Sequence, residues 1–274
     1  MLAGYIDESY TGEKEPVTFG LNCVYTTYSD WFWIQAAWRK VLEEKNEYLL
    51  AVGRKPIRRY HSQEISNFEG DFEDWTGDER TKLTKDLIAH ALTGHFVQSI
   101  GFTANLKEVA DVWPRVKFEG VKRFGYHAML RLIMLKLEGM IPEQFGRGAC
   151  VILINERCDY DAVMQGAFEH YLGARPEAKW IFGSIESKGW EECVPLQLAD
   201  FLAYEVMKET NRDRPGQKQR QRRKSLCSLL ELDNVGASSY EIPKEEILKW
   251  KLAVEEKDRK RGKQHLNDRF MDQS

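Results

Sequence analysis

The amino-acid sequence predicts a mixed α/β fold, in which a central sheet is flanked by helices. Short apolar runs rich in β-branched and aromatic residues alternate with segments in which apolar residues recur at helical spacing. The chain has 274 residues, of which 42% are hydrophobic, so it can fill a core of its own. Strands that alternate with helices are typical of the α/β and α+β classes.

Two strands and two helices are expected in the first third of the chain, at residues 1–6, 17–27, 29–53 and 77–94. Ser29 or Asp30 can cap the first of these helices, and Gly53 can end it. The residues between the two helices are expected to form a loop. Together these segments predict a helical insertion over about residues 29–94, directly after the second strand.

Three strands and three helices are expected in the rest of the domain, with the strands at residues 95–106, 147–158 and 179–187 and the helices at 120–140, 159–173 and 193–210. The helix at 120–140 is strongly apolar, which predicts that it is buried. Pro195 fits the first turn of the last helix. We expect one domain over residues 1–235 and a charged, helical tail over residues 236–274.

Composition excludes several classes of protein. The net charge of −3 and the pI near 6.1 provide no general basic field for nucleic acid, so any polyanion site must be local. No run of about 18 apolar residues is present, and we expect no membrane-spanning helix. The five cysteines lack the C-x-x-C spacing of a zinc ribbon. Their odd number and the lack of a secretion signal predict free thiols and a cytoplasmic location.

Acidic residues end or interrupt three segments that otherwise look buried. Asp7 and Glu8 follow the first apolar strand in YIDES. Asn155 and Glu156 close the strand VILINE. Asp200 lies in the apolar helix PLQLADFLAYEV, where an unpaired carboxylate would be costly to bury. Each alone has an ordinary explanation, as a turn, an acid before a helix cap or a hydrogen-bonded aspartate, but the combination favours a shared site.

If these acids converge, their repulsion raises their pKa values, and a divalent cation relieves it. Oxygen ligands without a His or Cys cluster suit Mg²⁺ or Mn²⁺ rather than zinc. We therefore predict that Asp7, Glu156 and Asp200 bind Mg²⁺ or Mn²⁺, as in sites of phosphoryl transfer. Glu8 is predicted to act beside Asp7 in catalysis. Nearby polar residues are expected to support the site, namely Ser9, Asn155 and Gln197.

A further acid and a histidine lie in the loop sequence RRYHSQEISNFEGD. His61 precedes Glu64 by three residues, so the two side chains meet if this stretch is helical. Glu64 is then a candidate for a fourth carboxylate of the site, with His61 beside it. The alternative is a pair of polar loop residues.

Two segments could contact a nucleic acid. The first expected helix carries Trp31, Phe32, Trp33 and Trp38, whose spacing is more typical of a core or a partner surface than of base stacking. A basic segment follows the helix that carries Asp200, and it is the best local polyanion site, with a solvated linker as the alternative. Its residues are Arg212, Arg214, Lys218, Arg220, Arg222, Arg223 and Lys224.

The motifs YIDES and PLQLADFLAYEV together resemble the signatures of a large bacterial and phage family called domain of unknown function 3800. These signatures are an Asp-Glu pair after an apolar strand, here Asp7 and Glu8, and a helical Gln-x-x-Asp, here Gln197 to Asp200. The resemblance covers about residues 3–207. It implies a ribonuclease H-like central mixed sheet flanked by helices, and a metal-dependent nuclease or a descendant of one. Asp7 and Asp200 would then be metal ligands. Nucleases of this superfamily often use a His or Glu near the metals to transfer protons, a catalytic role that His61 or Glu64 could take near neutral pH.

The sequence departs from the ribonuclease H-like pattern at two points. That pattern places an aspartate at the end of the central fourth strand, whereas this chain has Asn155 followed by Glu156. The pattern also has three consecutive antiparallel strands before its first helix, whereas about 65 residues separate the second strand from the third here. The first departure weakens the third metal ligand, and the second requires an insertion at the surface.

The sequence leaves two functions open. The first is a metal-dependent nuclease that hydrolyses phosphodiester bonds in DNA or RNA. The second is a catalytically inactive ribonuclease H-like module that binds nucleic acid or a partner protein, which the acidic net charge and Asn155 favour. Neutralising Asp7 or Asp200 would abolish turnover in the first case and leave binding intact in the second. An actin-like ATPase is disfavoured, because the loop after Asp7 offers one glycine, Gly12, rather than a Gly-rich phosphate loop. An aspartic protease is disfavoured, because Asp7 is followed by Glu8 rather than by a Thr/Ser-Gly turn.

Overall fold

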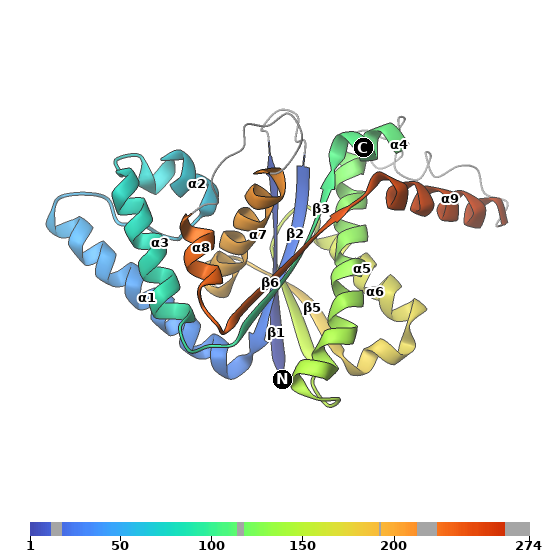
Figure 1. Cartoon of the computed structure of the whole chain (residues 1–274), viewed down its shortest axis with the longest axis horizontal. Coiled ribbons are helices and arrows are strands. Elements are labelled where there is room, and N and C mark those ends of the chain that lie inside the picture. The colour runs from blue at the N-terminus through green and yellow to red at the C-terminus, as the bar shows by residue number, and fades with distance from the viewer. Residues whose placement is uncertain (12–17, 114–117, 192, 213–223, 261–274) are drawn as a thin grey trace.

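The computed structural model describes residues 1–11, 18–113, 118–191, 193–212 and 224–260. These residues form a six-stranded sheet between two layers of helices (Figure 1). The strand order across the sheet is β5-β4-β1-β2-β3-β6. The strands are β1 (Leu2–Thr11), β2 (Thr18–Thr27), β3 (Val97–Asn105), β4 (Val151–Glu156), β5 (Phe182–Lys188) and β6 (Val235–Ile242).

The sheet contains both parallel and antiparallel pairs. β2 is antiparallel to β1 and to β3. β4 is parallel to β1, β5 is parallel to β4, and β6 is parallel to β3. The predicted mixed α/β class is therefore confirmed.

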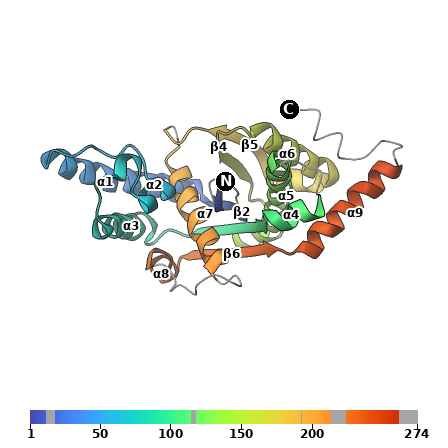
Figure 2. The same cartoon turned by 90° about the horizontal axis from the view of Figure 1, so that it is seen from above.

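Helices cover both faces of the sheet (Figures 1 and 2). One face carries α1 (Tyr28–Ala51), α2 (Ser62–Asn67), α3 (Gly77–Leu92), α7 (Pro195–Arg212) and α8 (Lys224–Leu230). The other face carries α4 (Leu106–Val112), α5 (Phe118–Phe145), α6 (Asp161–Ala174) and α9 (Lys244–Lys260). None of the described helices is long and apolar enough to cross a membrane.

The residues of β1 alternate between the two hydrophobic cores, as expected for a strand that is covered on both faces. Ala3 and Tyr5 pack in the core that contains α1, α3 and α7. Leu2 and Ile6 pack in the core that contains α5 and α6. The parity of a residue in β1 therefore decides which helical layer its side chain meets.

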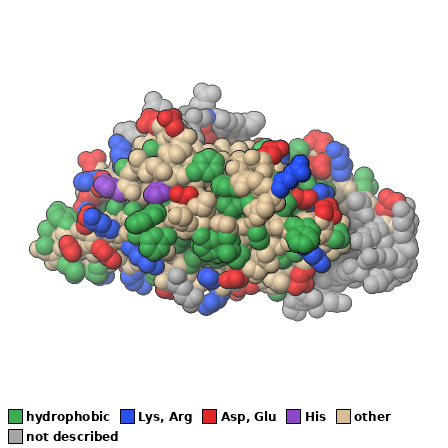
Figure 3. Space-filling model, turned by 90° about the horizontal axis from the view of Figure 1, so that it is seen from below, with side chains coloured by type: hydrophobic (Ala, Val, Ile, Leu, Met, Phe, Trp, Pro, Cys, Tyr) green, Lys and Arg blue, Asp and Glu red, His purple; other side chains and the backbone are tan. Residues whose placement is uncertain are grey.

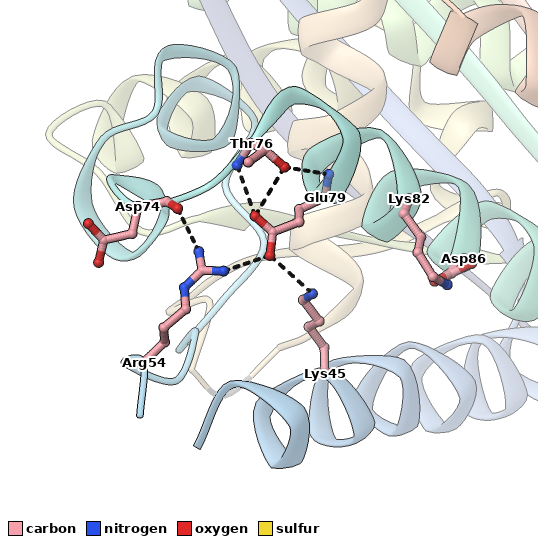
Figure 4. A network of polar contacts seen from close by, with 7 residues as sticks. All are labelled: Lys45, Arg54, Asp74, Thr76, Glu79, Lys82 and Asp86. Carbon is pink, nitrogen blue, oxygen red and sulfur yellow. Dashed lines mark hydrogen bonds and ion pairs between the residues drawn. The ribbon is translucent and has the colours of Figure 1, made fainter. Parts of the chain in front are cut away.

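The predicted insertion corresponds to α1, α2 and α3, which lie between β2 and β3. The cap of α1 is Thr27 rather than the expected Ser29 or Asp30, because the Thr27 side chain accepts a hydrogen bond from the Asp30 backbone N–H. The Thr27 hydroxyl also donates to Asp30 Oδ2 at 2.7 Å, so Asp30 completes the cap from within the first turn. A network of charged and polar contacts around Glu79 holds α3 against α1 (Figure 4).

The aromatic residues of α1 divide between the core and the surface. Trp31 and Trp38 are buried, whereas Phe32 and Trp33 are exposed, with their ring centroids 5.1 Å apart. Of these four, only the exposed pair is available to a partner or a base. Other hydrophobic side chains also reach the surface, and in the view from below they form several patches among charged residues (Figure 3).

The sheet continues beyond the expected domain boundary at residue 235. β6 pairs with β3 along its whole length, and Ile247 of α9 is buried in the core beside α5. The ends of β6 are buried while its middle is largely exposed, which is the pattern of an edge strand. Between the apolar end residues Val235 and Ile242, most of its residues are small or polar, so it lacks the apolar run of a central strand. The helical part of the expected tail is α9, and residues 261–274 lie outside the described residues.

Candidate active site

Asp7 and Glu8 lie within β1 rather than at its tip, which corrects the prediction from the sequence. β1 continues to Thr11 and stays paired with β2 throughout. Its pairing with β4 on the other edge ends at Ile6 and Asn155. The two acids therefore stand where β4 leaves β1 and exposes one edge of that strand. This divergence makes room for a pocket.

Strand alternation sends the acids to different faces of the sheet. Asp7 has the parity of Tyr5 and faces α7, and Glu156 has the parity of Ile154, which packs in the same core. Asp200 projects from α7, so three carboxylates from β1, β4 and α7 approach the same region. Glu8 faces α5 instead, where the Tyr126 hydroxyl forms a hydrogen bond with its carboxylate.

These acids line a pocket of about 370 Å³. The predicted residues that line it are Asp7, Glu8, Ser9, His61, Glu156 and Asp200. Glu64, Asn155 and Gln197 do not line it. The pocket therefore gathers residues from β1, β4, α7 and the insertion, which are far apart in the sequence.

Burial and mutual repulsion make the ionised form of these acids unfavourable. Asp7 is only 6% exposed, and burial together with the charges of Glu8, Asp200 and Glu156 raises its pKa well above the usual value. Burial is also the main cause that raises the pKa values of Glu8, Asp200 and Glu156. Arg59 opposes the rise at Glu156.

The Gln-x-x-Asp pair of α7 holds the segment that precedes α2. Gln197 Oε1 accepts hydrogen bonds from the Tyr60 backbone N–H at 2.9 Å and from Trp38 Nε1 at 3.1 Å. Asp200 Oδ2 accepts one from the Ser62 backbone N–H at 2.7 Å. The two bonded N–H groups flank residue 61, so this motif fixes the backbone on both sides of the pocket histidine.

His61 faces the pocket with Glu64 beside it. Glu64 Oε1 lies 3.1 Å from His61 Nδ1. Arg59 forms ion pairs with two acids, with Nη2 3.6 Å from Glu64 Oε1 and Nη1 3.7 Å from Glu156 Oε1. Its guanidinium carbon lies over the Trp190 ring, 4.7 Å from the ring centroid. The predicted approach of His61 and Glu64 is thus present, but Glu64 contacts the histidine rather than the pocket. Arg59 could not be predicted from the sequence, because its contacts depend on how the insertion folds back.

Two of the expected supporting residues have structural partners. Asn155 is buried, and its Nδ2 donates to Asp161 Oδ1 at 2.9 Å while its Oδ1 accepts from Ser187 Oγ at 3.2 Å. It thereby ties β4 to β5 and to the start of α6. The Ser9 hydroxyl donates to Met207 Sδ at 3.5 Å, which connects β1 to α7.

Most of the predicted basic segment cannot be placed. Arg212 ends α7 and forms an ion pair with Glu209 at 3.0 Å. Lys224 is the first residue of α8. The remaining members lie outside the described residues, namely Arg214, Lys218, Arg220, Arg222 and Arg223. Lys208, which was not among the predicted basic residues, lines the pocket two turns after Asp200.

The donor set of the pocket fits a hard divalent cation in its chemistry, since carboxylate oxygens predominate and their repulsion would be relieved by positive charge. Among the described residues, no three His, Cys, Asp or Glu side chains already stand in the arrangement of a metal site. Binding would therefore require Asp7, Glu156 and Asp200 to close around the ion.

Comparisons of the chain with protein-family models, with curated proteins and with solved structures give no match. The resemblance to domain of unknown function 3800 therefore stays a prediction, and function is inferred from the residues of the pocket.

Proposed function

We propose that this chain is a metal-dependent phosphodiesterase that acts on nucleic acid. The observation that carries the proposal is the convergence of Asp7, Glu156 and Asp200, from β1, β4 and α7, on one pocket. Asp7 is almost fully buried, and the charges that act on it are those of other acids, Glu8, Asp200 and Glu156. Acids that raise one another's pKa oppose folding when ionised, and a bound cation removes that penalty.

The arrangement of the sheet supports this reading. The first two strands are antiparallel, the third continues that pattern, and β4 lies parallel to β1 on its other edge. The acids stand on β1, on the adjacent β4 and on a later helix that covers them. The sequence resemblance implies a ribonuclease H-like sheet with acids at such positions, and we propose that relationship here.

In the proposed site Asp7, Asp200 and Glu156 would hold Mg²⁺ or Mn²⁺. A bound ion would polarise the phosphate and lower the pKa of a water molecule. His61 lines the pocket, and the contact of its Nδ1 with Glu64 leaves Nε2 for a proton of the reacting groups. Gln197 holds the backbone beside His61 and takes no direct part in the reaction.

The rim of the pocket supports a nucleic-acid substrate. Lys208 lies on the α7 side and can contact a phosphate. Tyr10 is 44% exposed on the β1 side and can stack on a base. The basic segment that begins at Arg212 follows soon after Lys208 in the sequence, and its charge could add phosphate contacts.

A non-catalytic binding module is the second candidate. Three observations favour it. Asn155 forms hydrogen bonds with residues outside the pocket, and Gln197 accepts hydrogen bonds from the Tyr60 backbone and from Trp38. One oxygen of Asp200 accepts a hydrogen bond from the Ser62 backbone N–H. These residues would then stabilise the insertion rather than hold a metal. This candidate predicts that nucleic-acid or partner binding survives neutralisation of Asp7.

A cleavage assay tests the proposal. Wild type, Asp7→Asn and Asp159→Asn are incubated with labelled DNA and RNA strands in Mn²⁺ or EDTA. Asp159 is an exposed acid three residues after Glu156 and serves as the control. We expect Mn²⁺-dependent cleavage by wild type and Asp159→Asn, and a loss of more than about 100-fold in Asp7→Asn, since even an outer partner of a metal ligand contributes about 10–100-fold. Equal cleavage by all three proteins, or none by wild type, would contradict it.

A further inference from the structure

The side-chain amide of Asn22 is buried close to the acid pocket, and its hydrogen-bonding groups are only partly satisfied. It lies on β2, opposite Asp7 in the antiparallel register, and is 1% exposed. Its Oδ1 accepts a hydrogen bond from Ser99 Oγ at 2.9 Å. Its Nδ2 is buried and has no hydrogen-bond partner in the described part of the chain. A buried amide N–H₂ without an acceptor is uncommon and calls for an explanation.

The neighbouring strand β3 provides both the space for this amide and a hydrogen-bond donor to it. Gly101 of β3 lies opposite Asn22, and a Cβ at that position would come within 2.9 Å of Asn22 Oδ1 and 3.1 Å of Val206 Cγ1. Ser99 supplies the donor for Oδ1 from the same strand. Because Oδ1 points toward β3, Nδ2 is directed away from β3. On the β1 side, the residue opposite Asn22 is Asp7.

We propose that Asn22 is a positioning residue for Asp7, an inference that rests on the proposed metal site. Directly opposite residues of an antiparallel pair have Cβ atoms about 4.5–5.5 Å apart, which brings an amide and a carboxylate within hydrogen-bond reach. If Asp7 binds the cation, Asn22 Nδ2 would donate a hydrogen bond to the Asp7 carboxylate. Such a partner fixes the orientation of a ligand and strengthens metal binding.

The competing role for Asn22 is purely structural, through its bond to Ser99. Thr103 provides a matched control, because it lies on the same face of β3, is 1% exposed and has a buried Oγ1 without a partner in the described residues. Thr103 is opposite Gly20 on β2, and its neighbour on β6 is the exposed Glu241, which lies outside the pocket. A structural role for a buried polar group changes the stability of the metal-free protein, whereas a positioning role changes the affinity for metal.

The test is isothermal titration of the full chain with Mn²⁺, for wild type, Asn22→Leu, Asn22→Ala and Thr103→Val. The melting temperature of each metal-free protein is measured in parallel, and the alanine variant covers the case in which leucine disturbs packing. We expect both Asn22 variants to bind Mn²⁺ about 10–100-fold more weakly than wild type. Thr103→Val should bind as wild type does.

Equal Mn²⁺ affinity in wild type and a folded Asn22 variant would overturn the role of Asn22 and leave the proposed metal site intact. An equal loss of affinity in Thr103→Val would also overturn it, because the effect would then come from general perturbation of the sheet. If wild type itself does not bind Mn²⁺, the proposed function fails, and the role of Asn22 fails with it.

Discussion

Acidic side chains have opposite electrostatic settings in two regions of the molecule. In the insertion, Glu79 Oε1 of α3 lies 2.6 Å from Arg54 Nη1 and 4.0 Å from Lys45 Nζ (Figure 4). Glu79 also completes a capping box with Thr76. Hydrogen bonds from Thr76 and Arg54 lower the pKa of Glu79. In the pocket, burial and neighbouring carboxylates raise the pKa of Asp7.

The difference separates acids that stabilise the fold from acids that oppose it. Ionised Glu79 gains from its cationic neighbours and its cap, so its charge contributes to folding. Ionised Asp7 is buried beside other acids, so its charge weakens the metal-free fold. Titratable groups with such perturbed pKa values in a pocket are candidates for a functional site.

The largest effect is expected from the pocket histidine. His61→Gln should reduce the rate of Mn²⁺-dependent cleavage by about 10²–10⁴-fold, the usual contribution of a general acid or base. Glu64→Gln should cause a smaller loss and shift the pH profile, since Glu64 acts through its contact with His61. Rates are measured with the labelled strands across pH 5.5–8.5, in roughly half-unit steps. An unchanged rate in His61→Gln would remove that residue from the reaction.

The next effect is a difference in stability between the two regions. Glu79→Gln should lower the free energy of unfolding by about 1–2 kcal/mol, because it removes a cap partner and the ion pair with Arg54. Metal-free Asp7→Asn should be as stable as wild type or more stable. Urea unfolding at neutral pH measures both. Similar destabilisation in the two variants would show that the acids do not differ.

The pH dependence of stability should also separate the regions. Folding raises the pKa values of Asp7, Glu8 and Asp200, so between the unfolded and folded pKa values the folded state binds more protons than the unfolded state. Metal-free wild type should therefore lose stability as pH rises above about 4. Folding lowers the pKa of Glu79, so its contribution exists above the unfolded pKa and is lost as pH falls through the folded value.

Urea unfolding of metal-free wild type and Asp7→Asn from about pH 4 to pH 7 tests this difference. The variant should lose less stability over that range than wild type. Identical slopes in the two proteins would mean that Asp7 does not carry the repulsion.

The smallest effect is expected at the rim of the pocket. Lys208→Gln should reduce the salt dependence of single-strand binding in EDTA by about 0.7 in the slope of log K against log salt, the value for one phosphate contact. Lys85→Gln, an exposed lysine on α3, is the control. Fluorescence anisotropy measures both. An unchanged slope in Lys208→Gln would exclude a phosphate contact at this lysine.

The acids of the pocket could be predicted from the sequence because each interrupts or ends an apolar segment. An acid within or after an apolar segment can be recognised from the neighbouring residues alone, and this holds for Asp7, Glu156 and Asp200. Their position within the strands could not be predicted, because it depends on where β1 and β4 part, a property of register. The roles of Gln197 and Arg59 likewise depend on contacts of the insertion with distant elements.

The fold class could be predicted for the same reason, since buried strands and helices leave clear apolar patterns. β6 leaves none, because an edge strand with an exposed middle needs few apolar residues. The expected boundary at residue 235 therefore falls at the first residue of a strand of the sheet. Asn22 was also missed, because a single asparagine within an apolar strand gives no sign of the acid opposite it.

The most direct test of the account is the thermal midpoint of wild type and Asp7→Asn, each with and without Mn²⁺. Without metal, the variant should melt at the same temperature as wild type or higher, because one repelling charge is removed. Mn²⁺ at about 100 times its dissociation constant should stabilise wild type by about 2.7 kcal/mol, which corresponds to a rise of about 5 °C or more. It should have little effect on the variant. If Mn²⁺ changes neither midpoint and Asp7→Asn melts lower than wild type, the acids are structural and the proposed metal site is wrong.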